Sequence, residues 1–554
     1  MDLGGLPLST PTPGFLSGGV WIGNTKVGYF RFFVIAVGLV LAVLLWLFQD
    51  KTRVGAQIRA GMDNREISST LGINNKLIFT GVFVLGSAIA GFSALLGGSM
   101  TGLNTGSTSW NVLTYSIIVV IVGGAGSIQG ALLGGLILGL ANSFLTVYLP
   151  NFTSFSFYAI LIIVLLIKPA GLLGRKMDVN KAIEADLEKT GSKGHGDVMP
   201  RAELTITHSK MSSRLIGYRG FPWFIVVLFL ALCPLFFSNY NVSMMSKVLI
   251  YALFAASLDI VMGYGGMRSF GHAAFFGLGG YVMGLVATFW GIKSFWLLLI
   301  IVVVFSAIAS AIISYFTLKF SGTYFLIITM AFGQLLSAIA EKWSGVTGGS
   351  DGLNVSINPE LGFLNIKWSG TSRYYFVLIV TVICFILLKL IMRSSFGRSI
   401  VGVRENEGRM RALGYNTWLT KYVSCILAAV FAGVAGMLYM YIYRTINPTV
   451  LNLTTSAMPM LMVIMGGGAT LWGPAIGAAI IIFFQTYSGI LFSERWMLLL
   501  GLLYVVCVLF LRGGIAPYLM RLYNWAGYKL FPDGKGASVP KHTSASANAG
   551  KEAK

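Results

Sequence analysis

The sequence predicts an all-α, polytopic transmembrane protein with about 13 to 15 spans in two homologous modules. Of its 554 residues, 56% are hydrophobic, only 11% are charged and 68 are glycine. Soluble domains carry roughly 25% charged residues and about 7% glycine, so this composition excludes a soluble enzyme, a disordered chain and a secreted disulfide scaffold. The apolar residues lie in long runs, and a set of polar landmarks occurs twice in the same order.

Each long apolar run is expected to be a helix, because a bilayer crossing needs roughly 20 apolar residues and lipid offers backbone groups no partner. The first part of the chain has runs at 30–48, 77–97, 112–122, 127–147 and 155–173. The second part has runs at 220–237, 246–263, 272–292, 296–318, 322–339, 373–392, 418–443, 456–466, 473–492 and 496–511. Runs 112–122 and 456–466 are short and lead directly into glycine clusters, so they are either spans or half-helices.

The basic residues predict the orientation of the chain. Of the 40 Lys and Arg residues, 30 fall in loops on one side of this topology, 6 on the other and 4 at span edges. Short cytoplasmic loops are enriched in basic residues, so we expect the N-terminus outside and the C-terminus in the cytoplasm. The net charge of +21 therefore reflects orientation and does not indicate nucleic-acid binding. Residues 1–29 lack the basic and apolar segments of a signal peptide.

An internal repeat divides the chain. Residues 55–74 align with 397–416 at an offset of 342, and residues 123–130 align with 466–473 at an offset of 343. We expect a partial first module at 1–175, a cytoplasmic linker at 176–219, a complete second module at 220–512 and a cytoplasmic tail at 513–554 with a disordered end. The first module has one span before its repeated segment and the second has six, which predicts a misplaced start, a truncated gene or a second chain that supplies the missing helices.

The sequence predicts no metal, disulfide or nucleotide site. All four cysteines, at positions 233, 384, 425 and 507, lie in apolar runs and are expected to be unpaired packing residues. The chain has no Gly-x-x-x-x-Gly-Lys-[Ser/Thr] phosphate loop. We therefore expect no cofactor in this chain, and any ATP hydrolysis must occur on another polypeptide.

Two repeated polar segments are candidate docking elements. Their charged residues have helical spacing and each segment ends in Leu-Gly, which predicts a short amphipathic cytoplasmic helix with a glycine C-cap. Such a helix is either a solvated loop or a structure that docks into a partner, and its occurrence in both copies favours docking. The candidate residues are Arg59, Asp63, Asn64, Leu71 and Gly72 in the first copy, and Arg404, Glu405, Asn406, Glu407, Leu413 and Gly414 in the second.

Glycines in the second pair of repeated segments recur every three or four residues. In an apolar helix this spacing predicts close helix packing and not a nucleotide cradle. The packing candidates are Gly126, Gly130, Gly134, Gly473 and Gly477.

Asp259 is the clearest single candidate for the translocation pathway. It lies about 13 residues into an apolar run, where a carboxylate costs about 2.5 to 3.5 kcal/mol unless it faces a polar interior. It either snorkels or caps near the cytoplasmic end, or lines a pathway or pairs with a subunit close to Arg268 or His272. His272 itself is either a gate or helix cap or a buried, satisfied histidine, and Ser269 lies in the same glycine-rich break.

The loop at 340–372 contains a turn rich in glycine and small polar groups, which is expected at the outer mouth. It either receives ligand from an external binding protein, shapes the pore entrance, or is a plain turn. Its groups suit a zwitterionic amino acid and equally suit urea or an amide. The candidate residues are Thr347, Gly348, Gly349, Ser350 and Asp351.

These motifs together resemble the permease pair of branched-chain amino-acid ABC importers. The resemblance is carried by the two Leu-Gly loops and by the sequences at 123–130, 258–281 and 347–353. Residues 1–175 are similar to the C-terminal half of the first permease subunit, and residues 220–512 to the whole second subunit. The resemblance implies a multi-pass permease of the bacterial inner membrane for branched-chain or related small amino acids.

The resemblance also implies partners. Two cytoplasmic ATP-binding subunits would hold the loop helices at 59–73 and 401–414 as coupling helices, and a periplasmic or extracellular substrate-binding protein would deliver ligand. The alternatives are a urea or amide permease of the same family, an ion-coupled secondary transporter, and an inactive remnant. The repeats share one orientation and few carboxylates lie in the spans, which disfavours ion coupling.

Overall fold

The computed structural model describes residues 16, 18–63, 65–101, 108–124, 126–168, 170–174, 226–320, 322–355, 360, 368–492, 496–510 and 513–520. The chain forms two compact units. The first comprises the residues up to Lys189 and Gln334–Lys342, and the second comprises the rest.

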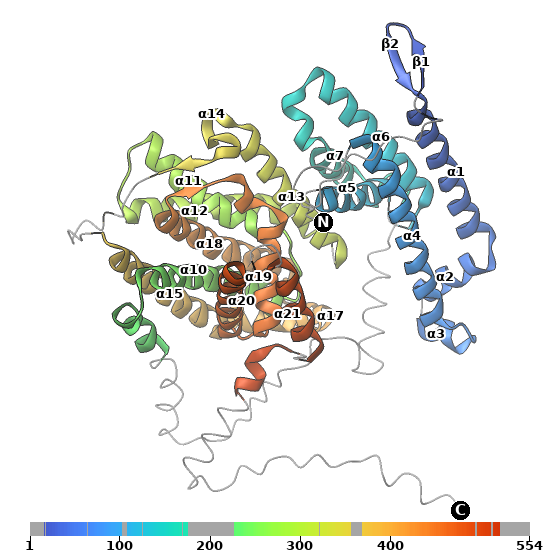
Figure 1. The fold of residues 1–554 in the computed structure, drawn as a ribbon. Coiled ribbons are helices and arrows are strands. Elements are labelled where there is room, and N and C mark those ends of the chain that lie inside the picture. The colour runs from blue at the N-terminus through green and yellow to red at the C-terminus, as the bar shows by residue number, and fades with distance from the viewer. Residues whose placement is uncertain are drawn as a thin grey trace, which may run out of the picture. The chain divides into compact units, whose positions relative to one another are not determined.

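The first unit opens with a hairpin of two antiparallel strands, β1 (Gly19–Ile22) and β2 (Thr25–Gly28). A long apolar helix, α1 (Tyr29–Lys51), follows and leads to two short helices, α2 (Arg53–Asp63) and α3 (Arg65–Thr70) (Figure 1). The remaining helices are α4 (Asn75–Thr101), α5 (Thr108–Gly123), α6 (Ile128–Tyr148), the 3-10 turn η2 (Pro150–Phe152) and α7 (Thr153–Ile167).

The second unit begins, within the described residues, with a short apolar helix at Val226–Phe236. Its first half consists of α10 (Asn239–Asp259), the π-helical turn η3 (Ile260–Tyr264), α11 (His272–Phe289), α12 (Phe295–Thr317), the part of α13 (Thr323–Lys342) up to Gly333, α14 (Ser344–Thr347), η4 (Gly349–Asp351) and β3 (Leu353–Asn354). Its second half consists of α15 (Gly370–Arg393), α16 (Ser395–Glu405), α17 (Glu407–Ala412), α18 (Thr417–Tyr443), β4 (Thr445–Ile446), η5 (Pro448–Leu451), α19 (Leu453–Gly466), α20 (Trp472–Leu491) and α21 (Trp496–Phe510).

The predicted fold class is confirmed. Within the described residues, 10 helices are long and apolar enough to cross a membrane, and five shorter apolar helices accompany them. These fifteen helices correspond one to one to the apolar runs of the sequence. The two short runs form α5 and α19, of 16 and 14 residues. At 1.5 Å per residue, helices of this length fall short of a hydrocarbon core about 30 Å thick.

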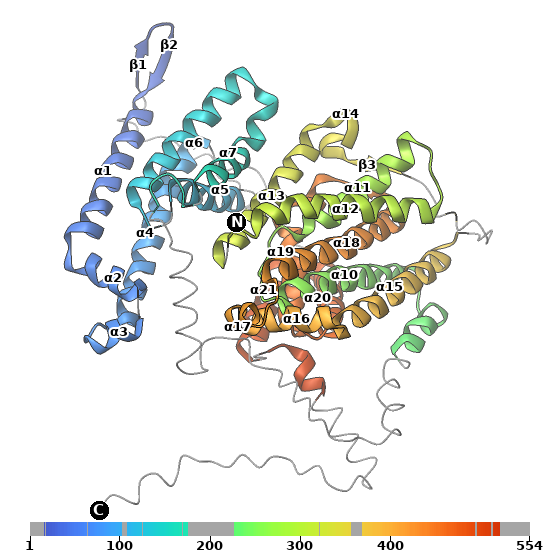
Figure 2. The same cartoon turned by 180° about the vertical axis from the view of Figure 1, so that it is seen from behind.

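Helix α10 is the core of the second unit. Buried residues make up 83% of its most apolar window, and α15, α18, α19 and α20 pack around it (Figure 2). A helix that is apolar on every side is stable only where every side is covered. Small residues such as Ala255, Ala256 and Ser257 are fully buried there and allow the surrounding helices to approach closely.

The helices of the first unit are much less covered. No residue in the most apolar windows of α1 and α4 is buried, and Phe83 and Leu95 on α4 are 75% and 69% exposed. Surfaces of this kind are covered by lipid in a membrane protein.

Candidate functional site

Each repeated polar segment folds into two short helices, which corrects the prediction of a single helix at each position. In the second copy the helix is interrupted at Asn406, where φ is −157° and the backbone is extended. The Asn406 side-chain oxygen accepts a hydrogen bond from the Arg409 N–H at 2.8 Å. Asparagine is a preferred N-cap because its side chain satisfies an N–H group that the helix leaves free. Asn406 therefore begins a new helix, α17.

Both segments end in the same glycine cap. Gly72 and Gly414 have φ values of 80° and 85°, a left-handed conformation that glycine adopts without steric penalty. The paired hydrogen bonds of a Schellman motif follow in each copy. They run from Ile73 N–H to Ser68 C=O and Gly72 N–H to Ser69 C=O, and from Tyr415 N–H to Met410 C=O and Gly414 N–H to Arg411 C=O, at 2.9 to 3.1 Å.

An exposed leucine precedes each cap. Leu71 is 73% exposed and Leu413 is 67% exposed. We refer to these two residues as the loop leucines. A single exposed leucine is common on protein surfaces, but its recurrence at the same place in both copies makes it a candidate contact for a partner.

The second segment is tied to the following helix by a charged cluster. Glu407 on α17 accepts hydrogen bonds from Arg411 at 2.7 Å, from Lys421 on α18 at 2.6 Å and from Thr417 at 3.0 Å. Partial burial by itself raises the pKa of Glu407. The net effect is a pKa below the ordinary value, because Lys421 supplies a hydrogen bond and a charge and because Thr417 and Arg411 also donate hydrogen bonds. Glu405, at the end of α16, is exposed.

The first segment is anchored differently. Arg59 on α2 donates to the Gln49 carbonyl and lies 3.4 Å from the Asp50 carboxylate, both near the end of α1. These groups are largely exposed, so the ion pair contributes little to stability. Asn64 and the side chain of Asp63 lie outside the described residues.

The repeated glycines lie where the backbones of neighbouring helices meet. A Cβ on Gly134 of α6 would lie 2.6 Å from the Val119 carbonyl oxygen of α5, and one on Gly477 of α20 would lie 2.1 Å from the Met462 carbonyl oxygen of α19. Gly130 and Gly473 are equally close to the backbones of the preceding helices. Gly126 differs from the predicted packing role: it lies in the turn before α6 with φ of 85° and open space beside it.

Asp259, at the end of α10, is fully buried and holds the turn that joins α19 to α20. Its carboxylate accepts the N–H of Ala469 at 2.7 Å and the N–H of Leu471 at 3.1 Å. Ala469 and Leu471 have positive φ values of 62° and 58°, a conformation that costs about 1–3 kcal/mol for residues other than glycine. We refer to residues 466–471 as the α19–α20 turn. The sequence pattern did not predict that Asp259 binds this turn. It suggested Arg268 or His272 as neighbours of Asp259.

His272 is a buried histidine at the contact of α10 and α11. It is 2% exposed, its Nε2 lies 2.8 Å from the Ser257 hydroxyl, and its ring stacks on Phe254 at 5.5 Å between centroids. Beside it lies a cavity of ≈ 20 Å³, enough for about one water molecule. The polar groups that line this cavity are Ser269, His272, Ser314, Thr317, Thr329 and Cys425.

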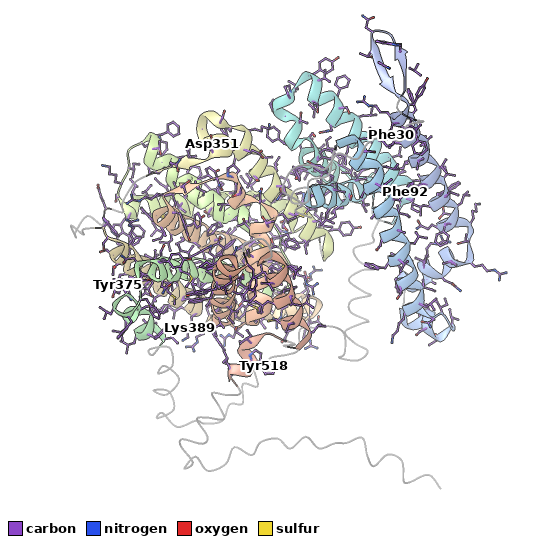
Figure 3. The ribbon with its side chains drawn as sticks, in the orientation of Figure 1. Phe30, Phe92, Asp351, Tyr375, Lys389 and Tyr518 are labelled. Carbon is purple, nitrogen blue, oxygen red and sulfur yellow. The ribbon has the colours of Figure 1, made fainter. Side chains whose placement is uncertain are left out.

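The predicted mouth turn is fastened to the far end of α18. Thr347 ends α14, Gly348 and Gly349 have φ of 76° and 62°, and Asp351, exposed at this end of the unit, is labelled in Figure 3. Ser350 lies between them in η4. Strand β3 pairs with β4, which follows α18, and the Val355 N–H donates to the Arg444 carbonyl at 2.7 Å. Helix α18 begins beside the Glu407 cluster, so its 27 residues, about 40 Å, separate the mouth turn from the loop helices.

Comparison with known proteins identifies the family. A family model described as the permease component of the branched-chain amino acid transport system matches residues 12–166 and 240–509. The chain belongs to this permease family. The two separate matches agree with two permease modules fused in one chain. Together with the apolar helices they make it a multi-pass transport protein of the inner membrane.

Several curated permeases of branched-chain amino acid transport are similar to parts of the chain. The high-affinity branched-chain amino acid transport permease LivM of Salmonella typhimurium is 24% identical over 306 residues, which cover 51% of this chain and 72% of the relative. LivH of Escherichia coli is 35% identical over 144 residues, covering 26% and 47%. BraD of Pseudomonas aeruginosa is 32% identical over 170 residues, covering 30% and 55%. No solved structure is significantly similar to the chain.

Proposed function

We propose that the chain forms the transmembrane pathway of an ATP-binding-cassette importer for branched-chain or related small amino acids. The observation that carries this proposal is the pair of loop-helix segments with matching glycine caps and exposed loop leucines. Two equivalent docking elements suit two equivalent partners. We infer that these partners are cytoplasmic ATP-binding subunits, one on each segment.

In this proposal the two ends of α18 have different tasks. The loop helices face the cytoplasm, as the basic residues around α16 and α17 suggest, and the mouth turn faces the outside. An external substrate-binding protein delivers its ligand at the mouth turn, whose exposed Asp351 and glycine-rich backbone offer polar groups to that protein. Closure of the ATP-binding subunits then moves the loop helices and switches access from one side to the other. The N-terminus accordingly lies outside and the C-terminus inside.

Reconstitution tests the proposal directly. Proteoliposomes with the full chain, its ATP-binding subunits and its binding protein are expected to accumulate radiolabelled leucine only when ATP is present. Vesicles in which ATP is maintained while ion gradients are collapsed should retain this uptake. Uptake that persists without ATP-binding subunits, or that stops when the ion gradient alone is removed, would instead establish a secondary transporter.

A second candidate substrate class is urea or a small amide. The cavity beside His272 is lined by hydroxyl, thiol, imidazole and apolar groups, with no carboxylate, ammonium or guanidinium among its lining residues. The cavity holds only about one water molecule and is not itself a solute site, but a pathway with this lining offers no charged partner to a zwitterion. A competition assay distinguishes the amino-acid substrate from the amide substrate. Unlabelled urea or acetamide should inhibit leucine uptake only if the pathway also transports amides.

A further inference from the structure

Arg404 connects the second loop-helix segment to the core helix of its unit. It lies in the last turn of α16, and its guanidinium donates a hydrogen bond to the Gly263 carbonyl in the π-helical turn η3. Gly266, with φ of 71°, lies directly beneath it: a Cβ there would be 2.7 Å from the Arg404 Cγ. The partly exposed side chain therefore lies along residues 263–266 and contacts the end of α10 from α16.

Gly263 also contacts the α19–α20 turn. A Cβ on Gly263 would lie 1.9 Å from Asp259 Oδ1 and 2.4 Å from the Ala469 nitrogen. The Gly263 backbone is thus enclosed by Arg404, the Asp259 carboxylate and the turn that Asp259 holds. The Arg404 charge also attracts the Asp259 carboxylate, although no ion pair within 4 Å involves Asp259 among the described residues. Because this backbone is tightly packed, we expect a displacement of α16 to move it.

Among the side chains that the structure describes in the first copy, none makes an equivalent connection. The residue equivalent to Arg404 at the offset of 342 is Met62, which is 66% exposed and carries no donor. In the first copy, Arg59 instead bonds within the loop and the end of α1. The two segments are alike at their glycine caps and unlike in their attachment to the helices behind them.

We infer that Arg404 is a positioning residue that transmits movement of the second loop-helix segment through Gly263 and Asp259 to the α19–α20 turn. The first segment lacks this transmission, so the two docking elements contribute unequally to transport. This inference rests on the proposed function, because it concerns how an ATP-binding partner acts on the pathway. The order of events is that α16 moves, the π-helical turn follows, and the α19–α20 turn is displaced.

The test replaces Arg404 with the residue that stands in the first copy. Arg404→Met and Arg404→Lys are compared with the unmodified chain in proteoliposomes that contain the ATP-binding subunits and the binding protein. Leucine uptake and phosphate release are measured in the same vesicles. Met62→Ala, at the equivalent position of the first segment, is the matched control.

For Arg404→Met we expect phosphate release to persist while leucine uptake per ATP falls roughly tenfold, within the range of allosteric coupling. Arg404→Lys should restore part of the ratio, since an ammonium group can still donate to the Gly263 carbonyl. Met62→Ala should leave the ratio unchanged.

An unchanged ratio in Arg404→Met overturns the inference. A parallel fall of uptake and phosphate release in Arg404→Met, Arg404→Lys and Arg404→Gln also overturns it, because that pattern indicates a merely structural role. If the Arg404→Met protein does not insert into the membrane, the ratio of leucine uptake to phosphate release is measured for the Arg404→Lys and Arg404→Gln proteins instead. Absence of ATP-dependent uptake in the unmodified chain contradicts the proposed function itself, so the two failures are distinguishable.

Discussion

The Asp259 carboxylate holds the backbone of Ala469, 210 residues further along the chain, at 2.7 Å. The interaction joins the end of the core helix α10 to a turn whose residues adopt left-handed backbone conformations. A buried carboxylate satisfied by backbone N–H groups stabilises such a turn, and its removal leaves those N–H groups without a partner.

We therefore expect Asp259→Ala to destabilise the second unit by about 2–5 kcal/mol, since one buried and one part-buried N–H group lose their acceptor. Asp259→Asn should be less damaging because its amide oxygen still accepts one of the two. Thermal unfolding in detergent measures both, with Asp351→Asn as an exposed control. Equal unfolding temperatures for Asp259→Ala and the unmodified chain would contradict the capping role.

Substitution of Gly477 should disrupt the contact of α19 and α20. A Cβ there would lie 2.1 Å from the Met462 carbonyl oxygen, so Gly477→Ala is expected to destabilise by about 1–3 kcal/mol through overpacking. Gly489→Ala is the matched control, because Gly489 lies on the same helix with nothing within 4 Å of a new Cβ. Helix propensity favours alanine at that site. If both variants unfold at the same temperature, the glycine contact is not what holds this helix pair.

The loop leucines provide a test of partner docking. Leu413→Lys and Leu71→Lys should change the free energy of unfolding by no more than about 0.5 kcal/mol, because both side chains are exposed. Each should reduce co-purification of the ATP-binding subunits at least several-fold, as expected for an apolar anchor at an interface. Asp351→Asn, also exposed but located in the mouth turn, serves as the control. Retention of the subunits by the double leucine variant would remove these residues from the docking surface.

The Glu407 cluster gives stability a defined pH dependence. The folded-state pKa of Glu407 is lowered, so its contribution is present above the ordinary glutamate range and is lost as pH falls through the folded value. Glu407→Gln should therefore be less stable than the unmodified chain at pH 7, and the difference should shrink in acid. Unfolding temperatures of both proteins across that pH range measure the effect. A difference that stays constant on acidification would mean that the ionised carboxylate is not the stabilising group.

Local patterns in the sequence were sufficient for the apolar helices and for the ends of the loop helices. Apolar runs become helices because the bilayer gives the backbone no other partner, and the fifteen runs and fifteen helices agree for that reason. Gly72 and Gly414 cap their helices because a glycine C-cap requires only a residue in the left-handed conformation and hydrogen bonds to the preceding helical turn. The break at Asn406 has an equally local cause, its side-chain N-cap, but the charge spacing around it continues across the break and conceals it.

The sequence by itself thus determined the all-α membrane fold, the repeat, the family and the glycine-capped loops, all of which depend on short-range order along the chain. Only the tertiary structure decided what surrounds Asp259, that Arg404 reaches Gly263, and that the mouth turn pairs with the end of α18. These contacts join residues 91 to 210 positions apart through backbone N–H and C=O groups. Every residue except proline carries both groups, and their pairing across the fold is set by how the helices pack and by no residue pattern.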